Sequence, residues 1–366
     1  MKQGWEYKKF EACINKTPKP KQVKTEEYNS GTKYPIVSQE DKLISGYYDD
    51  ESYVFHIDSP VVIFGDHTRV LKYVDFDFVV GADGVKIISP KQELNAKFLL
   101  YYLLWYKIPN LGYSRHYKLL KEINVPLPPK STQLSIVSEL DKINELIRLK
   151  KEQLKDYDNL AQSIFYEMFG DPVENEKGWD TSTYSKCFKI GSGGTPSKSI
   201  PEYWENGDIP WIGSNMCQNC IITETDGKFI TQDGLNHSST KYLEVGTVLV
   251  ALVGATIGKV ALLKTPTCTN QNIAFIKANE SKDFVPEFVF YNLMGQSEEF
   301  MKIGKGDFKM ASQAFVKALP IIVPPLPLQH LFAQRIEHIE RQKSAVQKSI
   351  TDLETLLASR MQYWFE

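Results

Sequence analysis

The sequence contains one segment twice, and the two copies lie 196 positions apart. In the first copy, a proline-rich stretch at residues 126–129 precedes a long helical pattern that runs from Gln133 to Phe169. The second copy has a proline-rich stretch at residues 324–327 and a helical pattern that begins at Gln329. Because matched repeats mark duplicated structural units, this repeat constrains the fold more than any other feature of the chain.

Apolar residues in both copies are spaced alternately by four and three positions, which predicts the heptad seam of a coiled coil. Lys150, Lys343 and Arg360 interrupt the series, and polar residues at such positions fix the register of pairing at some cost in stability. The predicted seam consists of Ile136, Leu140, Ile143, Ile147, Leu154 and Ile164 in the first copy and Phe332, Ile336, Ile339, Val346, Ile350, Leu353 and Leu357 in the second.

A long amphipathic helix cannot bury its seam alone, so two such helices in one chain predict that they pair with each other. The seam itself leaves the direction open, and antiparallel pairing would relate the two halves by a pseudo-two-fold axis. The alternative is a helical linker that packs on its own globular domain, although a linker has no reason to recur at the C-terminus.

We therefore expect an α+β fold in which two similar mixed α/β globular domains are separated by two long helices paired as an antiparallel coiled coil, with an internal pseudo-two-fold repeat. The expected parts are a first globular domain at residues 1–130, a first long helix at 131–170, a second globular domain at 171–326 and a second long helix at 327–366. Strand-like apolar runs separated by Gly, Asp and Pro indicate the mixed composition of both domains.

The charge of the chain restricts the surfaces that could bind nucleic acid. The formal net charge is −2; residues 1–130 carry 19 basic and 16 acidic residues, whereas residues 171–328 carry 14 basic and 17 acidic ones. A nucleic-acid surface would therefore have to be a local patch. The five cysteines are sparse and odd in number, and neither a signal peptide nor a run of 18 apolar residues occurs, so we expect a reduced, cytoplasmic protein without membrane contact.

The order of globular domain, proline stretch, glutamine and long helix, followed by the same order again, resembles the specificity subunit of type I restriction–modification enzymes. The second half carries the more specific signature: Gly-Gly-Thr-Pro-Ser at 193–197, Pro-Glu-Tyr-Trp at 201–204 and Gly-Asp-Ile-Pro-Trp-Ile at 207–212. The first half has only Lys-Thr-Pro-Lys at 16–19 in place of the Gly-Gly-Thr-Pro-Ser run. Thr132 and Leu328 also stand where the family often has Glu before the glutamine.

The resemblance implies that each globular domain is a target-recognition domain that reads one half of a bipartite sequence in double-stranded DNA. It also implies that the paired helices set the spacer between the halves. The implied partners are two modification (methyltransferase) subunits and restriction (endonuclease/translocase) subunits, while the chain itself is no enzyme and has no cofactor. The alternative from the residues alone is a helical-rod scaffold whose two end domains bind proteins rather than DNA.

The motifs that would indicate catalysis or metal binding are incomplete in this sequence. No Asn/Asp-Pro-Pro-Tyr methyltransferase motif occurs, and residues 254–260 have neither the spacing nor the Ser/Thr of a phosphate loop. Cys217 and Cys220 have the spacing of a zinc knuckle, but a structural zinc site needs four ligands and no second pair exists. We therefore predict no catalytic residue and no metal site.

Donor-rich loops are the candidates for DNA contact, because Arg can bridge guanine O6 and N7, Gln suits adenine, and Lys, Ser and Thr can hold phosphates. The alternative for every one of these loops is a solvated surface without a partner. The candidate DNA-binding residues are Lys16, Lys19, His67, Arg69, Tyr113, Ser114, Arg115, His116, Lys118, Thr195, Ser197, Lys198, Thr256, Lys259, Lys305, Lys309, Ser312 and Gln313.

Overall fold

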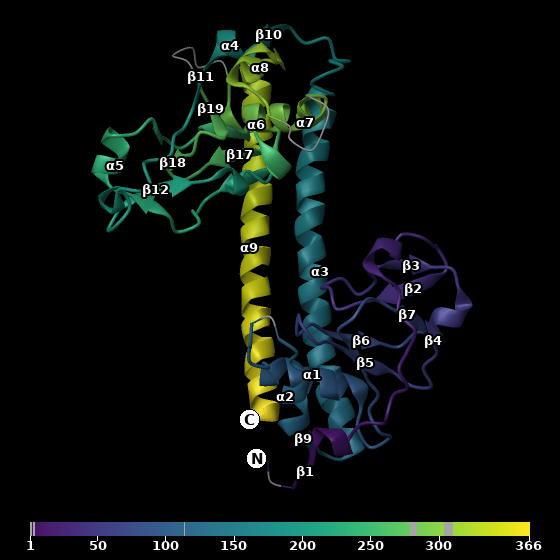
Figure 1. The fold of residues 1–366 in the computed structure, drawn as a ribbon. Helices are drawn as coiled ribbons and strands as arrows, with labels where there is room; N and C mark the ends of the chain where they lie inside the picture. Colours follow the sequence, from purple (N-terminus) through teal and green to yellow (C-terminus); the bar gives the residue numbers. More distant parts are fainter. Residues whose placement is uncertain (1, 3, 113, 279–283, 304–309) are drawn as a thin grey trace. The chain divides into compact units, whose positions relative to one another are not determined.

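The computed structural model describes residues 2, 4–112, 114–278, 284–303 and 310–366. The chain divides into two compact units. Unit 1 comprises Met1–Glu152 and Gln347–Glu366, and unit 2 comprises Gln153–Val346. Each unit therefore contains a part of both long helices, together with the globular residues of one repeat (Figure 1).

Unit 1 is built from two small sheets, a two-stranded ribbon and two short helices. One sheet has the order β3-β2-β7-β4, the other has the order β6-β5-β8, and β1 pairs with β9. The strands are β1 (Glu6–Lys9), β2 (Tyr34–Val37), β3 (Gly46–Tyr48), β4 (Val54–Phe55), β5 (Val61–Gly65), β6 (Leu71–Val74), β7 (Phe78–Val80), β8 (Val85–Ile88) and β9 (Asn124–Leu127), and the helices are α1 (Ala96–Tyr106) and α2 (Tyr117–Glu122).

Unit 2 repeats this plan and adds strands to it. Its sheets have the orders β14-β12-β18-β15 and β11-β19-β16-β17-β13, and β10 pairs with β20. The strands are β10 (Thr181–Thr183), β11 (Phe188–Ser192), β12 (Ile209–Ile212), β13 (Cys220–Ile222), β14 (Phe229–Ile230), β15 (Tyr242–Leu243), β16 (Val248–Ala251), β17 (Val260–Leu263), β18 (Thr267–Thr269), β19 (Ile273–Ala278) and β20 (Pro320–Ile322). The short helices are α4 (Tyr184–Cys187), α5 (Gln232–Asn236), α6 (Pro286–Gly295), α7 (Ser297–Met301) and α8 (Gln313–Ala318).

The strand pairings confirm the internal repeat. In unit 1, β2 and β7 are parallel, with Ile36 opposite Val79; in unit 2, β12 and β18 are parallel, with Trp211 opposite Cys268. The antiparallel trio β6-β5-β8 corresponds to β17-β16-β19, and unit 2 extends that trio with β11 and β13. The two globular parts are therefore the same mixed α/β arrangement, which confirms the predicted fold class.

The long helices α3 (Lys130–Phe169) and α9 (Leu326–Phe365) each have 40 residues, and both their starts and their ends lie 196 positions apart. Both helices begin three residues before the predicted starts at Gln133 and Gln329. The reason is that prolines immediately before or within a first helical turn do not interrupt its hydrogen bonds. Gly170 ends α3 in the left-handed conformation, with φ of +79°.

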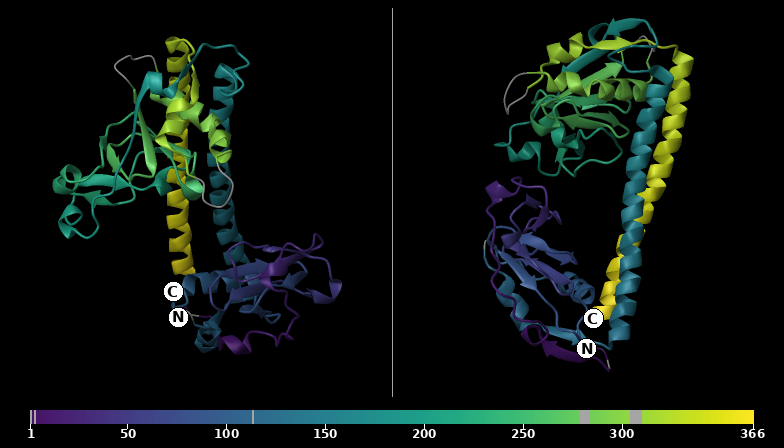
Figure 2. Two further views of the ribbon diagram at one scale, coloured as in Figure 1. Left: turned by 45° about the horizontal axis from the view of Figure 1, so that its top comes forward. Right: turned by 90° about the vertical axis from the view of Figure 1, so that its right-hand side faces the viewer.

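Contacts within each unit show that α3 and α9 run antiparallel. In unit 1, Arg360 of α9 pairs with Glu139 of α3, and Lys151 further along α3 pairs with the earlier Glu354 of α9 at 2.8 Å. In unit 2, Lys343 Nζ lies 2.7 Å from Asp158 Oδ1. The two helices lie side by side in both views of Figure 2.

Most of the predicted seam is buried, and its half-buried positions lie in the second half of each helix. Ile136, Leu140, Phe332, Ile336, Ile339 and Ile350 are at most 4% exposed, and Ile143, Ile147 and Val346 are also buried, whereas Leu154, Ile164, Leu353 and Leu357 are half-buried. Near the helix ends the buried positions shift to Phe165, Phe169 and Phe365. The shift occurs because these ends face the globular core as well as the partner helix.

Each globular part packs around the start of one long helix and the end of the other. In unit 1, the ring of Phe365 lies 5.5 Å from Phe98 and 5.7 Å from Tyr102, both on α1. In unit 2, the ring of Phe169 lies 4.9 Å from Phe288 on α6. The helices α1 and α6 therefore occupy equivalent places in the two cores.

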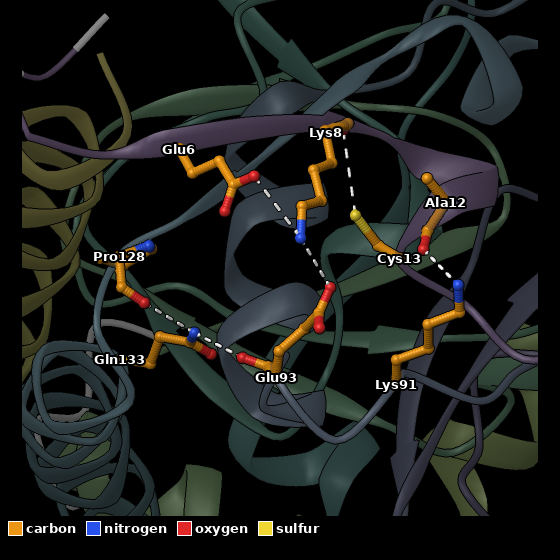
Figure 3. A network of polar contacts seen from close by, with 8 residues as sticks. All are labelled: Glu6, Lys8, Ala12, Cys13, Lys91, Glu93, Pro128 and Gln133. Carbon is orange, nitrogen blue, oxygen red and sulfur yellow. Dashed lines mark hydrogen bonds and ion pairs between the residues drawn. The ribbon is translucent and has the colours of Figure 1, made fainter.

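A repeated glutamine is buried at the start of each long helix, and Figure 3 shows the first of the two, Gln133. Gln133 Nε2 donates to the carbonyl oxygens of Pro128 and Glu93, both at 2.9 Å, and its Oε1 accepts from the backbone nitrogen of Asn95 at 2.8 Å. Asn95 is the N-cap of α1. The side chain therefore joins the first turn of α3 to the entry of α1.

Gln329 makes the equivalent contacts in unit 2. Its Nε2 donates to the Pro324 carbonyl at 2.9 Å, and its Oε1 accepts from the backbone nitrogen of Val285, the N-cap of α6, at 3.0 Å. Both glutamines are fully buried, with exposed fractions of 0–1%. A polar residue in such a place is stable only because its donors and acceptors are satisfied.

Candidate nucleic-acid interface

The loops of unit 1 converge at one edge of its sheets. Strands β2 and β7 are parallel, so their carboxyl ends meet at the same side, and the loop that leaves β5 joins them there. We call residues 38–42, 66–70, 81–84 and 114–116 the loop edge of unit 1. Three backbone hydrogen bonds hold it together: Gly81 N to Val37 O, Asp66 N to Gly84 O, and His116 N to Asp66 O.

Unit 2 has the same edge with the same backbone connections. Asn270 N donates to Ile212 O, Leu252 N donates to Asn272 O, and Ala311 N donates to Leu252 O. These bonds match the three of unit 1 strand by strand. We call residues 213–219, 252–259, 270–272 and 310–312 the loop edge of unit 2.

The loop edge of unit 1 carries charged side chains of both signs, namely Lys42, Arg69, Arg115, Glu40, Asp41, Asp66 and Asp83. Arg115 Nη2 lies 3.2 Å from Asp83 Oδ2, and both side chains are mostly exposed. Beside the edge is a groove of about 670 Å³ whose lining includes Lys16, Lys19 and Lys86. Since an exposed ion pair contributes little stability, Arg115 can exchange its carboxylate for another acceptor.

The structure changes the interpretation of two candidates in unit 1. His116 is fully buried; its Nδ1 lies 2.9 Å from the Asp66 carbonyl, and its Nε2 accepts from Leu111 N at 3.0 Å. Both ring nitrogens are thus occupied within the protein, so His116 is removed from the candidate DNA contacts. Arg69 has φ of +62°, and its Nη1 donates to the Ile108 carbonyl at 3.2 Å, which uses part of its guanidinium internally.

The remaining candidates of unit 1 lie at or near the loop edge. His67 is half-buried, and its backbone nitrogen donates to Gln39 Oε1 at 3.3 Å. Ser114 is half-buried, and Lys118 is exposed on α2. Lys16 and Lys19 are exposed on the extended segment that lines the groove. Tyr113 lies outside the described residues.

The loop edge of unit 2 presents mainly amides, and its one charged side chain is Lys259. Thr195 Oγ1 donates to Gln271 Oε1 at 2.7 Å, and Lys259 Nζ donates to Gln218 Oε1 at 2.6 Å. Asn270 and Asn272 flank Gln271, which is exposed. Gln313 Nε2 donates to Ser192 Oγ at 2.8 Å. Amide side chains are the groups that pair bidentately with adenine, so this edge differs from that of unit 1 in chemistry although not in backbone.

The other candidates of unit 2 are spread around this edge. Ser197 Oγ lies 2.7 Å from Ser199 Oγ, and Lys198 is exposed. Thr256 Oγ1 donates to the Val253 carbonyl at 3.4 Å, and Ser312 caps α8 by accepting from Phe315 N at 3.1 Å. Lys305 and Lys309 lie outside the described residues.

Sequence reasoning missed several residues that organise these edges, among them Gln39, Lys72, Lys86, Gln218 and Gln271. A pair of polar residues, Ser38 and Gln39, after the predicted strand at 34–37 was a usable signal for Gln39. Lys72 gave no such signal, because a lysine within a strand is normally assigned to the solvent face.

The cysteines and carboxylates of the described residues do not form a metal site, since no cluster of three or more metal-binding side chains occurs among them. Cys217 is fully buried, and burial raises the pKa of its thiol to about 12. Burial also raises the pKa of Cys268 to about 11. Within the same part of the chain, no helix is long and apolar enough to cross a membrane.

Comparison with protein families gives the relationship of the chain. The type I restriction modification DNA specificity domain matches residues 2–156 and 176–355, which cover most of both repeats. The chain belongs to this family. The family is one of DNA recognition and not of catalysis, in agreement with the resemblance seen in the sequence.

Two relatives from type I restriction enzymes align with most or half of the chain. The specificity subunit of the type I restriction enzyme EcoR124I/EcoR124II from Escherichia coli is 25% identical over 357 residues, which cover 90% of this chain and 84% of that protein. The specificity subunit of the HindI enzyme from Haemophilus influenzae is 27% identical over 194 residues, covering 50% of this chain and 41% of that protein.

Solved structures show the same fold at lower identity. A chain from a study of complex assembly and conformational transition in the type I R-M system superposes with a TM-score of 0.58 at 17% identity, covering 100% of this chain and 98% of that one. The S subunit from M. genitalium superposes with a TM-score of 0.57 at 15% identity, covering 99% and 96%.

Proposed function

We propose that the chain is the sequence-specific DNA-recognition subunit of a type I restriction–modification complex, in which each loop edge reads one half of a bipartite DNA target. The main support is the pair of loop edges, which share their backbone hydrogen bonds but carry different side chains. Duplicated modules with diverged donors suit two different half-sites, because base identity is read by the donors and acceptors in the groove.

The proposal assigns different roles to different side chains. Arg115 in unit 1 and the amides around Gln271 in unit 2 are the proposed base readers, since guanidinium suits guanine and amides suit adenine. Lys16, Lys19, Lys118 and Lys198 are the proposed phosphate contacts, because exposed lysines act as point charges on the DNA backbone. The proposed recognition domains are residues 1–130 and 171–326.

The proposal also includes the helices and the partners. Residues 131–170 and 327–366 would set the spacer between the half-sites and provide the surface on which methyltransferase and restriction subunits dock. The chain would act without a cofactor of its own, and the reaction would belong to its partners.

Mapping of methylated adenines tests the function directly. A cell that carries the chain with its modification partner should contain one split methylated motif, and deletion of the chain should abolish it. An Arg115→Gln variant should relax one half of the motif, whereas Lys277→Gln, at a lysine paired with Glu244 near the end of β19 away from the loop edge, should leave the motif intact. An unchanged methylation pattern after deletion would contradict the proposal.

A further inference from the structure

A buried lysine lies behind the loop edge of unit 1. Lys72, on β6, is only 6% exposed. Its Nζ donates to the Ser38 carbonyl at 2.9 Å and also contacts the Lys42 carbonyl. Burial lowers the pKa of the Lys72 ammonium, against the opposing charges of Glu40 and Asp41. A lysine is rarely buried unless its donors are satisfied, and here the acceptors are carbonyl oxygens at the two ends of one turn.

That turn carries Gln39, which connects the other loops of the edge. Gln39 Nε2 donates to the Asp83 carbonyl at 3.0 Å, and Gln39 Oε1 accepts from His67 N at 3.3 Å. The Gln39 carbonyl accepts from Thr68 Oγ1 at 2.7 Å. One side chain and its backbone thus bind the loop after β5 and the loop after β7.

The backbone at Gly81 and Gly84 packs so closely against Ser38 and Gln39 that neither glycine has room for a side chain. Gly84 has φ of +96°, and a Cβ there would lie 2.7 Å from Gln39 Oε1. A Cβ on Gly81 would lie 2.7 Å from the Cβ of Ser38. Because the neighbouring chain segments approach so closely, displacement of residues 38–42 would displace the residues beside them, including Asp83, the partner of Arg115.

Unit 2 has a different solution at the same position. Lys72 faces Ile63 across β5 and β6, and the corresponding pair in β16 and β17 is Leu249 and Ala261. Ala261 is fully buried in an apolar cluster that includes Cys217 and Ile212. The lysine contact is therefore specific to unit 1 and not a requirement of the shared sheet.

We propose that Lys72 and Gln39 are positioning residues that hold the loop edge of unit 1 in the conformation that reads its half-site. The inference rests on the proposed function and assigns these two residues to the selectivity of one half of the target. Lys72 is buried, and the amide nitrogen and oxygen of Gln39 are both hydrogen-bonded to backbone groups. The two residues therefore act by positioning Arg115 and His67 rather than by contacting bases.

The test uses the full chain assembled with its modification subunits and a duplex library with every single-base change in the target. Lys72→Met keeps the aliphatic stem but removes the donors, and Gln39→Leu removes the amide. Each should reduce discrimination at one half-site by about ten-fold or more, leaving discrimination at the other half-site and the salt dependence of binding unchanged. Lys72→Arg keeps the charge and donors and should restore most of the selectivity. The control Lys33→Met alters an exposed lysine just before β2, outside the loop edge, and should leave discrimination at both half-sites unchanged.

The outcomes separate the two proposals. A wild-type complex without a bipartite preference would overturn the proposed function. A wild-type preference that survives Gln39→Leu, which changes a half-exposed residue and should leave the fold intact, would overturn the positioning role alone. Equal loss at both half-sites, or a uniform loss that includes non-specific DNA, would also overturn it, because a general structural defect has that signature.

Discussion

Unit 1 and unit 2 have the same backbone topology, but different residues support their loop edges and different side chains are exposed on them. Both clamp the start of a long helix with a buried glutamine, and both close their loop edge with the same three backbone hydrogen bonds. Unit 1 then supports its edge with the buried Lys72 and presents charged side chains of both signs, whereas unit 2 fills the same place with Ala261 and its apolar neighbours and presents mainly amides. The buried glutamine and the three backbone hydrogen bonds are therefore requirements of the fold, whereas the supporting residue and the exposed side chains are specific to each loop edge.

The buried glutamine that both units share predicts equal and large losses of stability when it is replaced in either unit. Gln133→Leu and Gln329→Leu each leave buried backbone groups without partners, and each should lower the free energy of unfolding of its own unit by about 3 kcal/mol. Urea denaturation followed by hydrogen exchange at α1 and α6 would measure this.

Gln342→Leu, at an exposed position of α9, is the matched control and should change the free energy of unfolding little. If Gln133→Leu lowered the free energy of unfolding of unit 1 and Gln329→Leu left that of unit 2 unchanged, the two glutamines would not be equivalent. The interpretation that both units are stabilised by the same buried glutamine would then be wrong.

Because the two edges carry different side chains, substitutions beside the edge of unit 1 should change the affinity for DNA, and substitutions in the edge of unit 2 should change the selectivity for one half-site. Lys16→Gln with Lys19→Gln should lower the slope of log K against log salt by up to about 2, with a loss of affinity on the order of ten-fold near 0.1 M salt. Gln218→Ala with Gln271→Ala should leave that slope unchanged and relax one half-site instead. Salt titrations of DNA binding by the assembled complex would measure both, and a slope that falls equally for the two pairs would remove the distinction.

The smallest expected effects concern pH and the paired helices. In unit 1, a hydrogen bond from Arg360, together with one from Trp364, lowers the pKa of Glu139 despite its partial burial. The ionised carboxylate therefore stabilises the fold above its ordinary value of 4.5, and this contribution, about 1 kcal/mol, is lost as pH falls through the lowered pKa.

Unit 2 should respond at the opposite end of the pH range. Burial lowers the pKa of Lys343, but its hydrogen bonds to Asp158 and Glu340 outweigh burial and the net pKa is raised above 10.5. Its contribution is complete below that value and lost as pH rises through the raised pKa. Unfolding measured against pH should show the acid loss disappear in Glu139→Gln and the alkaline loss disappear in Lys343→Met. An acid loss that persists in Glu139→Gln would assign it to other carboxylates.

The candidate site was only partly visible in the sequence. Arg115 and the Lys16–Lys19 segment could be proposed because donor-rich loops are recognisable by residue type, and the structure places them at or beside one edge. His116 belonged to the same run of residues, yet its ring is buried against the carbonyl of Asp66, 50 positions away in the chain. Residue type does not reveal which member of a loop turns inward, since that depends on contacts between segments distant in sequence.

The sequence by itself determined the repeat, the two long helices and their common register, because helical periodicity and glycine or proline boundaries are local properties of the chain. The 196-residue offset of the seam reappears in the bounds of α3 and α9. Only the tertiary structure decided the antiparallel direction, the clamp made by Gln133 and Gln329, and the support of one edge by a buried lysine. These features depend on which distant groups can satisfy one another once water has been excluded, and no local pattern records that.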